Sequence, residues 1–338
     1  MASIKDVAHL TGCSPSTVSR VVNKKGNISE EMERRVLEAI QQVGYIPNSV
    51  ARSLKNSKTN TIGVIVPDIS ESFFAQIIKG INLVSGEKDY SIMLCDSSED
   101  PERESSLISL LSENRVEGMI IATVQNDDRI EDVVHQVGCP IVFVDNVPGS
   151  IRGFDSVSTD NIKASYLAVE HLVNQGHKRI AAIMGKRTEH TGFDRYSGYL
   201  KALAHRNIPV EENLVRFGDF KEQSGYEAMM DLLASGLDFT AVYIASSKMT
   251  YGAIAAIREA GLRMPEDLSL VGFDIQDEYK LMSPGITSIC QQDREVGRCA
   301  AEIVFRRIDE AMSGPDVCEH IVLEPFLELR ESVVELSE

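Results

Sequence analysis

From residue 61 onward, short segments rich in Val and Ile alternate with longer amphipathic segments. The short segments predict strands at 62–66, 92–95, 118–122, 141–144, 180–184, 241–245 and 268–273. The longer segments predict helices at 74–87, 102–114, 163–175, 195–206, 224–235, 249–259 and 294–312. Apolar strands with a helix in every gap are typical of parallel sheets that helices cover on both faces. So many units favour an α/β fold of two doubly wound lobes over a single sheet.

The first 46 residues carry helical patterns instead. Apolar side chains recur at helical spacing in three groups, which are Ile4, Val7 and Ala8, then Val18, Val21 and Val22, then Met32, Val36, Ile40 and Val43. Gly12 suits a tight turn, and Ser14 and Pro15 suit the N-cap and first position of the second helix. A helix-turn-helix is therefore predicted from Ile4 to Asn23. The outer, polar face of its second helix fits the major groove of DNA.

Charge separates the same two regions. The whole chain has a net charge of −17, which by itself argues against nucleic-acid binding. The first sixty residues hold nine Lys and Arg against five Asp and Glu, a balance of +4, and the remainder holds 25 against 46, or −21. An acidic body repels phosphates and keeps a protein off DNA except where a basic head docks. Because this head is small, we expect its affinity to depend on dimerisation.

Other patterns argue against several classes of protein. The six cysteines form no CxxC pair and the seven histidines show no metal-ligand spacing, so reduced thiols, no metal and no cofactor are expected. No apolar run approaches the roughly 20 residues that cross a bilayer, and the N-terminus lacks a secretion signal, so we expect a cytoplasmic protein without membrane contact. Because the phosphate-binding and nucleophile-elbow motifs are missing, an enzyme, the main competing class, is not expected.

A short segment with its own pattern lies between the head and the lobes. Residues 47–55 permit a two-turn helix, and the polar residues 56–60 are typical of a linker. The predicted parts are a headpiece at 1–46, a hinge helix and linker at 47–60, and an effector-binding and dimerisation core at 61–338. Within the core, the first lobe is predicted at about 61–160 plus 292–318, and the second at about 161–291 plus 319–338.

Several short motifs occur along the chain in a characteristic order and spacing. They are Ile4-Lys5-Asp6-Val7-Ala8, Thr17-Val18-Ser19-Arg20-Val21-Val22-Asn23, Gly44-Tyr45-x-Pro47-Asn48, Ala51-Arg52-x-Leu54, Ile62-Gly63-Val64-x-x-Pro67-Asp68, Gly176-His177, Pro265-Glu266-Asp267-Leu268-Ser269-Leu270-Val271-Gly272-Phe273-Asp274 and Glu328-Leu329-Arg330-Glu331-Ser332. On these motifs the chain resembles the LacI/GalR family of bacterial transcriptional regulators, from residue 3 to about residue 332. The resemblance implies a helix-turn-helix head on a core of the periplasmic-binding-protein-like type I fold. No leucine heptads follow Ser332, so a homodimer is expected rather than a tetramer.

The resemblance implies which head residues face double-stranded operator DNA. They are Pro15, Ser16, Thr17 and Arg20 on the recognition helix. Arg20 suits bidentate pairing with guanine N7 and O6, which is worth about 1–3 kcal/mol of discrimination. Ser16 and Thr17 then divide their hydroxyls between bases and phosphates, although the alternative makes them simple first-turn helix residues.

The resemblance also assigns the hinge residues Ala51, Leu54 and Lys55 to DNA. Leu54 is similar to the family's wedge leucine, which enters the minor groove at the centre of a near-palindromic operator beside its dimer mate. A wedge unstacks one base step, and pyrimidine–purine steps yield most easily, so a central CG step is expected. The alternative is that Leu54 only anchors the linker helix.

Ligands of doubly wound folds bind beyond the carboxyl ends of the strands, and the resemblance implies an effector cleft between the two lobes. Its implied residues are Phe73, Phe74, Asp145, Thr191, Arg195, Phe220, Ser247, Asp274 and Gln291. Aromatic rings stack on flat ligands or sugar faces, and Arg and Asp hydrogen-bond vicinal hydroxyls. The alternatives are core packing for each Phe and a surface ion pair for Arg195.

Departures from the family pattern bear on the ligand. Ser246-Ser247-Lys248 replaces an acid that is common in the family after the strand at 241–245, and the added lysine favours an anionic ligand unless it points into solvent. Glu189 stands where the purine-responsive branch has an arginine, which argues against a purine corepressor.

The sequence therefore predicts a repressor of carbohydrate uptake or catabolism genes, which a sugar or sugar derivative releases from its operator. One alternative is a catabolite-control-type regulator that binds a phosphorylated carrier protein. Glu302 stands where that branch has an arginine, but Arg298, Arg306 and Arg307 lie nearby on the same predicted helix. The other alternative is a sugar-binding protein without a regulatory role.

Overall fold

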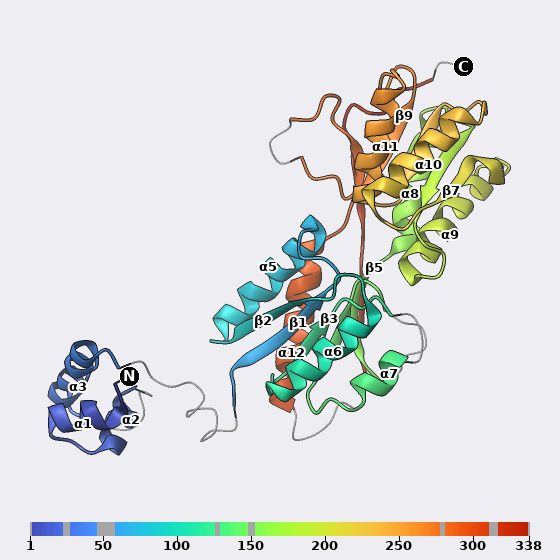
Figure 1. The fold of residues 1–338 in the computed structure, drawn as a ribbon. Coiled ribbons are helices and arrows are strands. Elements are labelled where there is room, and N and C mark those ends of the chain that lie inside the picture. The colour runs from blue at the N-terminus through green and yellow to red at the C-terminus, as the bar shows by residue number, and fades with distance from the viewer. Residues whose placement is uncertain are drawn as a thin grey trace. The chain divides into compact units, whose positions relative to one another are not determined.

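A computed structural model of the chain describes residues 2–22, 28–45, 58–125, 129–147, 153–277, 281–310 and 317–336 (Figure 1). The chain divides into two compact units, Met1–Thr59 and Asn60–Glu338. Most of the predicted hinge lies outside the described residues, including Ala51, Leu54 and Lys55. None of the described helices is both long and apolar enough to cross a membrane.

The first unit holds three helices, α1 (Ile4–Thr11), α2 (Pro15–Val22) and α3 (Glu30–Val43). Their shared core contains the apolar side chains Val7, Ala8, Val18, Val21, Val36 and Ala39. Gly12 ends α1 at φ 66°, a conformation that glycine adopts without steric cost, and Ser29 Oγ accepts the Met32 N–H at the start of α3. The predicted helix-turn-helix is therefore present over its described residues, and Asn23 lies outside them. The other predicted apolar side chains, Ile4, Val22, Met32, Ile40 and Val43, are partly buried against this core.

The first lobe of the second unit is built on six parallel strands in the order β11-β5-β4-β3-β1-β2. The strands are β1 (Thr61–Val66), β2 (Ser91–Asp96), β3 (Met119–Ile121), β4 (Ile141–Val144), β5 (Asp155–Thr159) and β11 (His320–Leu323). Helices α5 (Ser72–Glu87) and α12 (Asp293–Glu310) pack on one face, and α6 (Pro101–Glu113) and α7 (Arg129–Val134) pack on the other. Because successive strand residues face opposite sides, Val64 contributes to one core and Ile65 to the other.

The second lobe repeats this plan with the order β12-β10-β9-β8-β6-β7. Its strands are β6 (Ile180–Met184), β7 (Val215–Phe217), β8 (Ala241–Ile244), β9 (Ser269–Phe273), β10 (Thr287–Cys290) and β12 (Phe326–Glu328). Helices α8 (Asn161–Asn174) and α9 (His190–His205) cover one face, α10 (Glu222–Ala234) and α11 (Ser247–Glu259) cover the other, and a short 3-10 helix, η1 (Glu212–Leu214), precedes β7. Only the edge strand β12 runs antiparallel among these described strands. The predicted pair of doubly wound lobes is confirmed.

The path of the C-terminal segment corrects one expectation. Residues 319–338 were predicted to belong to the second lobe, but β11 pairs with β5 in the first sheet, His320 beside Ser156. The last crossing between lobes therefore lies between β11 and β12. The sequence pattern misses β5, β7, β10, β11 and β12 because they are short and polar residues interrupt their apolar runs, including the buried Asp155, Ser156, Thr287 and Ser288.

Candidate functional site

The outer face of α2 carries the predicted DNA-reading residues. Pro15, Ser16 and Arg20 are exposed, and Thr17 is half-buried. Ser14 Oγ accepts the Thr17 N–H at 3.2 Å and lies 2.6 Å from Ser16 Oγ, so the hydroxyls form a local network around the N-cap. Within the described part of the chain, Arg20 enters no ion pair. Its guanidinium therefore requires no rearrangement of the head before it can bind an acceptor.

The rest of the head is braced independently of that face. Arg35 Nη2 donates to the Thr11 carbonyl at 2.8 Å, which ties α3 to the end of α1. Thr11 Oγ1 donates back to the Val7 carbonyl at 2.8 Å. The contacts that hold the three helices together thus leave the outer side of α2 free to serve recognition.

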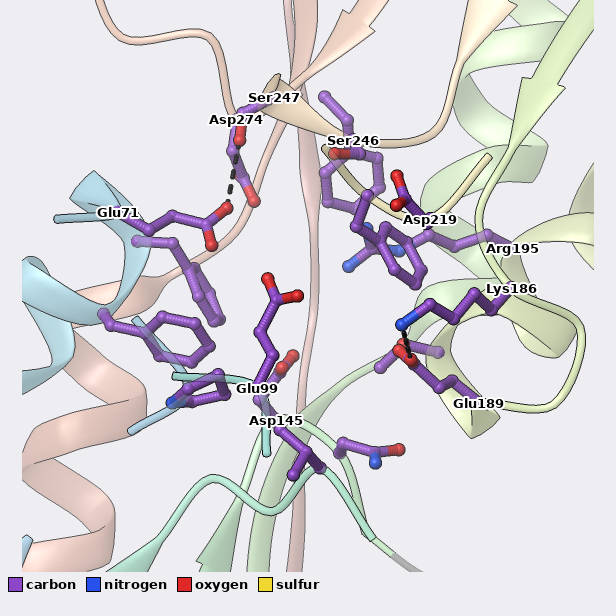
Figure 2. Close-up of a pocket in the computed structure, with 18 of the residues that line it drawn as sticks. Glu71, Glu99, Asp145, Lys186, Glu189, Arg195, Asp219, Ser246, Ser247 and Asp274 are labelled. Atoms are coloured by element: carbon purple, nitrogen blue, oxygen red, sulfur yellow. Dashed lines mark hydrogen bonds and ion pairs between the residues drawn. The ribbon is translucent and has the colours of Figure 1, made fainter. Parts of the chain in front are cut away.

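A cavity of about 250 Å³ lies between the two lobes of the second unit (Figure 2). All nine residues predicted for the effector cleft line it, namely Phe73, Phe74, Asp145, Thr191, Arg195, Phe220, Ser247, Asp274 and Gln291. The structure thus brings them together, and their contact with an effector stays a prediction. Lining residues that were not predicted include Glu71, Glu99, Asn146, Lys186, Asp219, Ser246 and Phe273. Their only sequence signal is a position at or just after the end of a strand, or near a helix start.

Four non-glycine residues of the lining have a left-handed backbone conformation. They are Glu99 (φ 58°), Asp145 (φ 64°), Phe220 (φ 69°) and Asp274 (φ 51°). Asp145 and Asp274 directly follow β4 and β9, so the first residue after each of these strands lines the cavity. L-residues adopt this conformation at an energetic cost and retain it where the surrounding structure imposes it, often at ligand sites.

Arg195 is the buried cation of the cavity, with 7% of its surface exposed. Its Nε donates to Asn161 Oδ1 at 2.7 Å and its Nη1 donates to the Ala245 carbonyl at 2.8 Å. The guanidinium carbon also lies 3.8 Å from the centroid of the Phe273 ring. The alternative of a surface ion pair is therefore wrong, because neutral acceptors and an aromatic face orient this side chain from α9 into the cavity.

Asp274 and Gln291 form a second fixed pair. The Gln291 N–H donates to Asp274 Oδ1 at 3.0 Å, and its Nε2 donates to Oδ2 at 2.6 Å. Burial raises the pKa of Asp274, while the hydrogen bonds from Gln291 and the charge of Arg195 oppose that rise. Gln291 is 8% exposed, and its Oε1 is buried without a hydrogen-bond partner in the described structure.

Acidic side chains outnumber basic ones around the cavity. Its lining contains Glu71, Glu99, Asp145, Glu189, Asp219 and Asp274 against Lys186 and Arg195. Figure 2 shows the carboxyl groups of Glu71, Glu99 and Asp145 directed toward the same central space. Burial raises the pKa of Asp145 to about 7, against the opposing charge of Arg195 and with the support of negative neighbours. Burial likewise raises the pKa of Glu71.

Lys248 does not line the cavity, which corrects the inference of an anionic ligand. Its Nζ donates to Asp68 Oδ2 at 2.6 Å and lies 3.9 Å from Glu71 Oε2, so the lysine joins the two lobes at the cavity rim. Burial raises the pKa of Asp68, but hydrogen bonds from Lys248 and Ser70 outweigh it and lower the pKa to about 2. Lys221 makes a similar bridge to Glu99 at 3.3 Å. The positive charge that suggested an anion is already neutralised.

The arginines near Glu302 are also engaged. Arg298 pairs with both Glu295 and Glu302, and Arg306 pairs with Glu319 at 2.7 Å. Arg307 is buried and its Nη2 lies 2.8 Å from Asp155 Oδ1. No arginine of this group is left without a carboxylate, which weakens the case for a phosphorylated carrier protein at α12.

The described residues contain no cluster of three or more His, Cys, Asp or Glu with a geometry suited to a metal ion. What the chain does present is a helix-turn-helix on one unit and a ligand-sized cavity between two α/β lobes on the other. This combination defines a DNA-binding transcriptional regulator that carries an effector-binding core.

Family comparisons agree with this class. Residues 3–48 match the family described as bacterial regulatory proteins, lacI family, and residues 59–321 match periplasmic binding proteins and sugar binding domain of LacI family. The chain belongs to the LacI family of bacterial transcriptional regulators, and it is a regulator rather than an enzyme. The resemblance inferred from the motifs is thereby confirmed.

Individual relatives match nearly the whole chain. This chain is 35% identical over 334 residues to the HTH-type transcriptional repressor PurR of Pasteurella multocida, and the match covers 98% of this chain and 99% of that protein. The solved structure of the lac repressor dimer bound to operator and the anti-inducer ONPF has a TM-score of 0.86 at 28% identity, covering 98% of this chain and 99% of the other. A complex of the regulator CelR with cellobiose has a TM-score of 0.74 at 30% identity, covering 98% and 100%.

Proposed function

We propose that the chain binds a near-palindromic operator as a homodimer and represses genes of carbohydrate uptake or catabolism. A sugar or sugar derivative in the interlobe cavity controls this binding. The observation that carries the proposal is the convergence of nine residues, predicted from separate segments, on one cavity. The lac repressor structure, which holds operator and ONPF, and the CelR complex, which holds cellobiose, support it by similarity.

The mechanism is a two-state switch. In the operator-bound state, Arg20 pairs with a guanine edge and Leu54 enters the minor groove at a central CG step. A ligand controls DNA binding only through a difference in its affinity for the two arrangements of the lobes. The rim bridges Lys248–Asp68 and Lys221–Glu99 join the lobes, so a ligand that changes the angle between the lobes must strengthen or break them.

A gel shift with the full-length protein tests the whole proposal. The duplex is the DNA upstream of the protein's own gene, compared with a scrambled duplex at moderate ionic strength, with and without candidate sugars. We expect a sequence-specific shift that one sugar or sugar derivative weakens. Equal binding to both duplexes under every small molecule would contradict the proposal, and so would chemical turnover of a bound compound.

The hinge wedge has a separate test. Leu54→Ala removes the apolar wedge, so operator affinity should fall strongly while the core keeps its ligand affinity. Leu37→Ala, which truncates a half-exposed leucine on α3, serves as the matched control. If Leu54→Ala retains the operator affinity of the control, the wedge role is lost and Leu54 only anchors its segment.

The relatives named PurR make a purine corepressor the second candidate. Against it, Glu189 lines the cavity and pairs with Lys186 at 3.1 Å, in the place where the purine-responsive branch has an arginine. A purine base in the same gel shift decides between the two. Stronger operator binding with the base would favour corepression, and an unchanged shift would favour the sugar-controlled switch.

A further inference from the structure

The hydrogen-bonding groups of the cavity are mostly acceptors. Besides its six carboxylates, the lining includes Gln291 Oε1, which is buried and has no donor among the described residues. The Nε2 of Gln291 donates to the Asp274 carboxylate at 2.6 Å, and this contact fixes which amide atom is the oxygen. A buried acceptor without a donor is costly, so a bound ligand is expected to donate to it.

The cations around the cavity are mostly committed to other partners. Lys186 pairs with Glu189, Lys221 with Glu99, and Lys248 with Asp68. Arg195 donates its Nε and Nη1 to neutral oxygens rather than to a carboxylate. Three acids of the lining, Asp145, Asp219 and Asp274, therefore make no ion pair among the described residues.

Asp145 is the clearest example of a lining acid without an ion pair among the described residues. No described hydrogen bond reaches its carboxyl oxygens, and it faces the negative charges of Glu71, Asp274 and Glu189 as well as the positive charge of Arg195. The Asp145 backbone is held at φ 64°, so the turn after β4 aims the side chain into the cavity (Figure 2). A positively charged group in this space would gain charge-assisted hydrogen bonds and relieve the repulsion.

The cavity also offers apolar surface at the same place. Phe73 and Phe74 begin α5, and their rings meet edge to face with centroids 5.1 Å apart. Both rings also belong to the buried core of the first lobe, and Phe220 lines the cavity from the second lobe. Aromatic faces attract cations and also cover the apolar side of a ring. The volume of about 250 Å³ admits a compact molecule rather than an extended one.

We propose that the effector is a small organic cation: a protonated amine on a hydroxylated or ring scaffold, such as an amino derivative of a sugar. Its ammonium group lies among Glu71, Asp145 and Asp274, one of its donors reaches Gln291 Oε1, and its apolar face packs on the phenylalanines. This proposal rests on the proposed function and specifies the charge of the ligand for that same cavity. It replaces the anionic ligand that Lys248 had suggested.

The test is a binding screen with the full-length protein at pH 7.5. Glucosamine, glucose and glucuronate share one ring and differ in charge, and further positive, neutral and negative metabolites extend the three classes. Binding is read by the shift in unfolding temperature and confirmed by calorimetry. We expect the cations to bind and the anions to fail.

Variants connect the binding to the cavity. Asp145→Asn should weaken the binding of the cation about tenfold or more, because a charge-assisted hydrogen bond is lost. Asp132→Asn, the same change on the exposed surface of α7, is the control. Should Asp145→Asn fail to fold, Glu71→Gln replaces it with the same expectation.

Three outcomes would overturn the inference. Neutral or anionic compounds that bind in the cavity better than the cations contradict the proposed charge. Cation binding that survives Asp145→Asn and Glu71→Gln unchanged places the ligand elsewhere. If no compound of any class binds while the gel shift stays sequence-specific, effector control itself fails, and the charge inference fails with it.

Discussion

The head and the core place their candidate functional side chains in opposite environments. On α2, Ser16 and Arg20 are exposed, and the helices are held together by other residues such as Val18 and Arg35. Between the lobes, Arg195 and Gln291 are more than nine-tenths buried and bond to residues far away in the sequence. Recognition and stability are therefore separable in the head and coupled in the core.

Loss of the buried arginine gives the largest expected effect. Arg195→Ala removes two charge-assisted hydrogen bonds and a contact with Phe273, and it leaves Asn161 Oδ1 without its donor. We expect the free energy of unfolding to fall by about 2–4 kcal/mol. Urea denaturation measures it. Arg258→Ala, which changes an arginine on the exposed side of α11, is the control. If both variants lose the same free energy of unfolding, the buried contacts of Arg195 do not stabilise the core, and the contrast between the head and the core fails.

The matching change in the head should affect binding alone. Arg20→Ala should weaken operator binding about 5- to 150-fold, the equivalent of about 1–3 kcal/mol, with an unchanged unfolding temperature. Fluorescence anisotropy with a labelled operator and a scrambled duplex measures the effect. A uniform loss on both duplexes would assign Arg20 to phosphate rather than to a base.

The acids of the cavity predict a pH dependence. The pKa of Asp145 rises from 3.8 to about 7 on folding, so between these values the folded state holds a proton that the unfolded chain has lost. The free energy of unfolding therefore falls as the pH rises from 3.8 toward 7, because the ionised carboxylate of Asp145 is less favourable in the folded state than in the unfolded chain. The unfolding temperature of Asp145→Asn relative to the unchanged protein should therefore increase from pH 4.5 to pH 7 and then level off.

The comparison of Asp145→Asn with the unchanged protein also cancels the effect of two histidines that titrate in the same pH range. Burial lowers the pKa of His171 and His177, which makes stability rise with pH over part of the same range. Both histidines are present in both proteins, so their effect cancels in the difference. A difference that stays constant from pH 4.5 to pH 8 would show that Asp145 ionises normally.

The rim bridge gives the smallest expected effect. Lys248→Met breaks the contact with Asp68 at a site that is only partly buried, so we expect a loss of about 0.2–1 kcal/mol that disappears in high salt. Thermal unfolding at low and high ionic strength measures it. Lys201→Met, on the exposed side of α9, is the control, and a loss that salt does not reduce would mean that packing, not charge, holds the rim.

Much of the site followed from the family resemblance, which supplied positions such as Phe73, Asp145 and Asp274. These positions lie next to strands or at helix starts, and a doubly wound sheet brings such positions to one edge. The ligand's charge did not follow in the same way. Lys248 looked like a free cation in the sequence, but its partner Asp68 lies 180 residues earlier in the chain.

The sequence alone determined the helix-turn-helix, the two-lobed α/β core and the family, because caps, turns and apolar periodicity act over a few residues. The tertiary structure decided that β11 belongs to the first sheet, that Lys248 is neutralised and that Gln291 Oε1 has no donor among the described residues. These features depend on contacts between segments far apart in the chain. Burial and electrostatic pairing arise only when the fold brings those segments together.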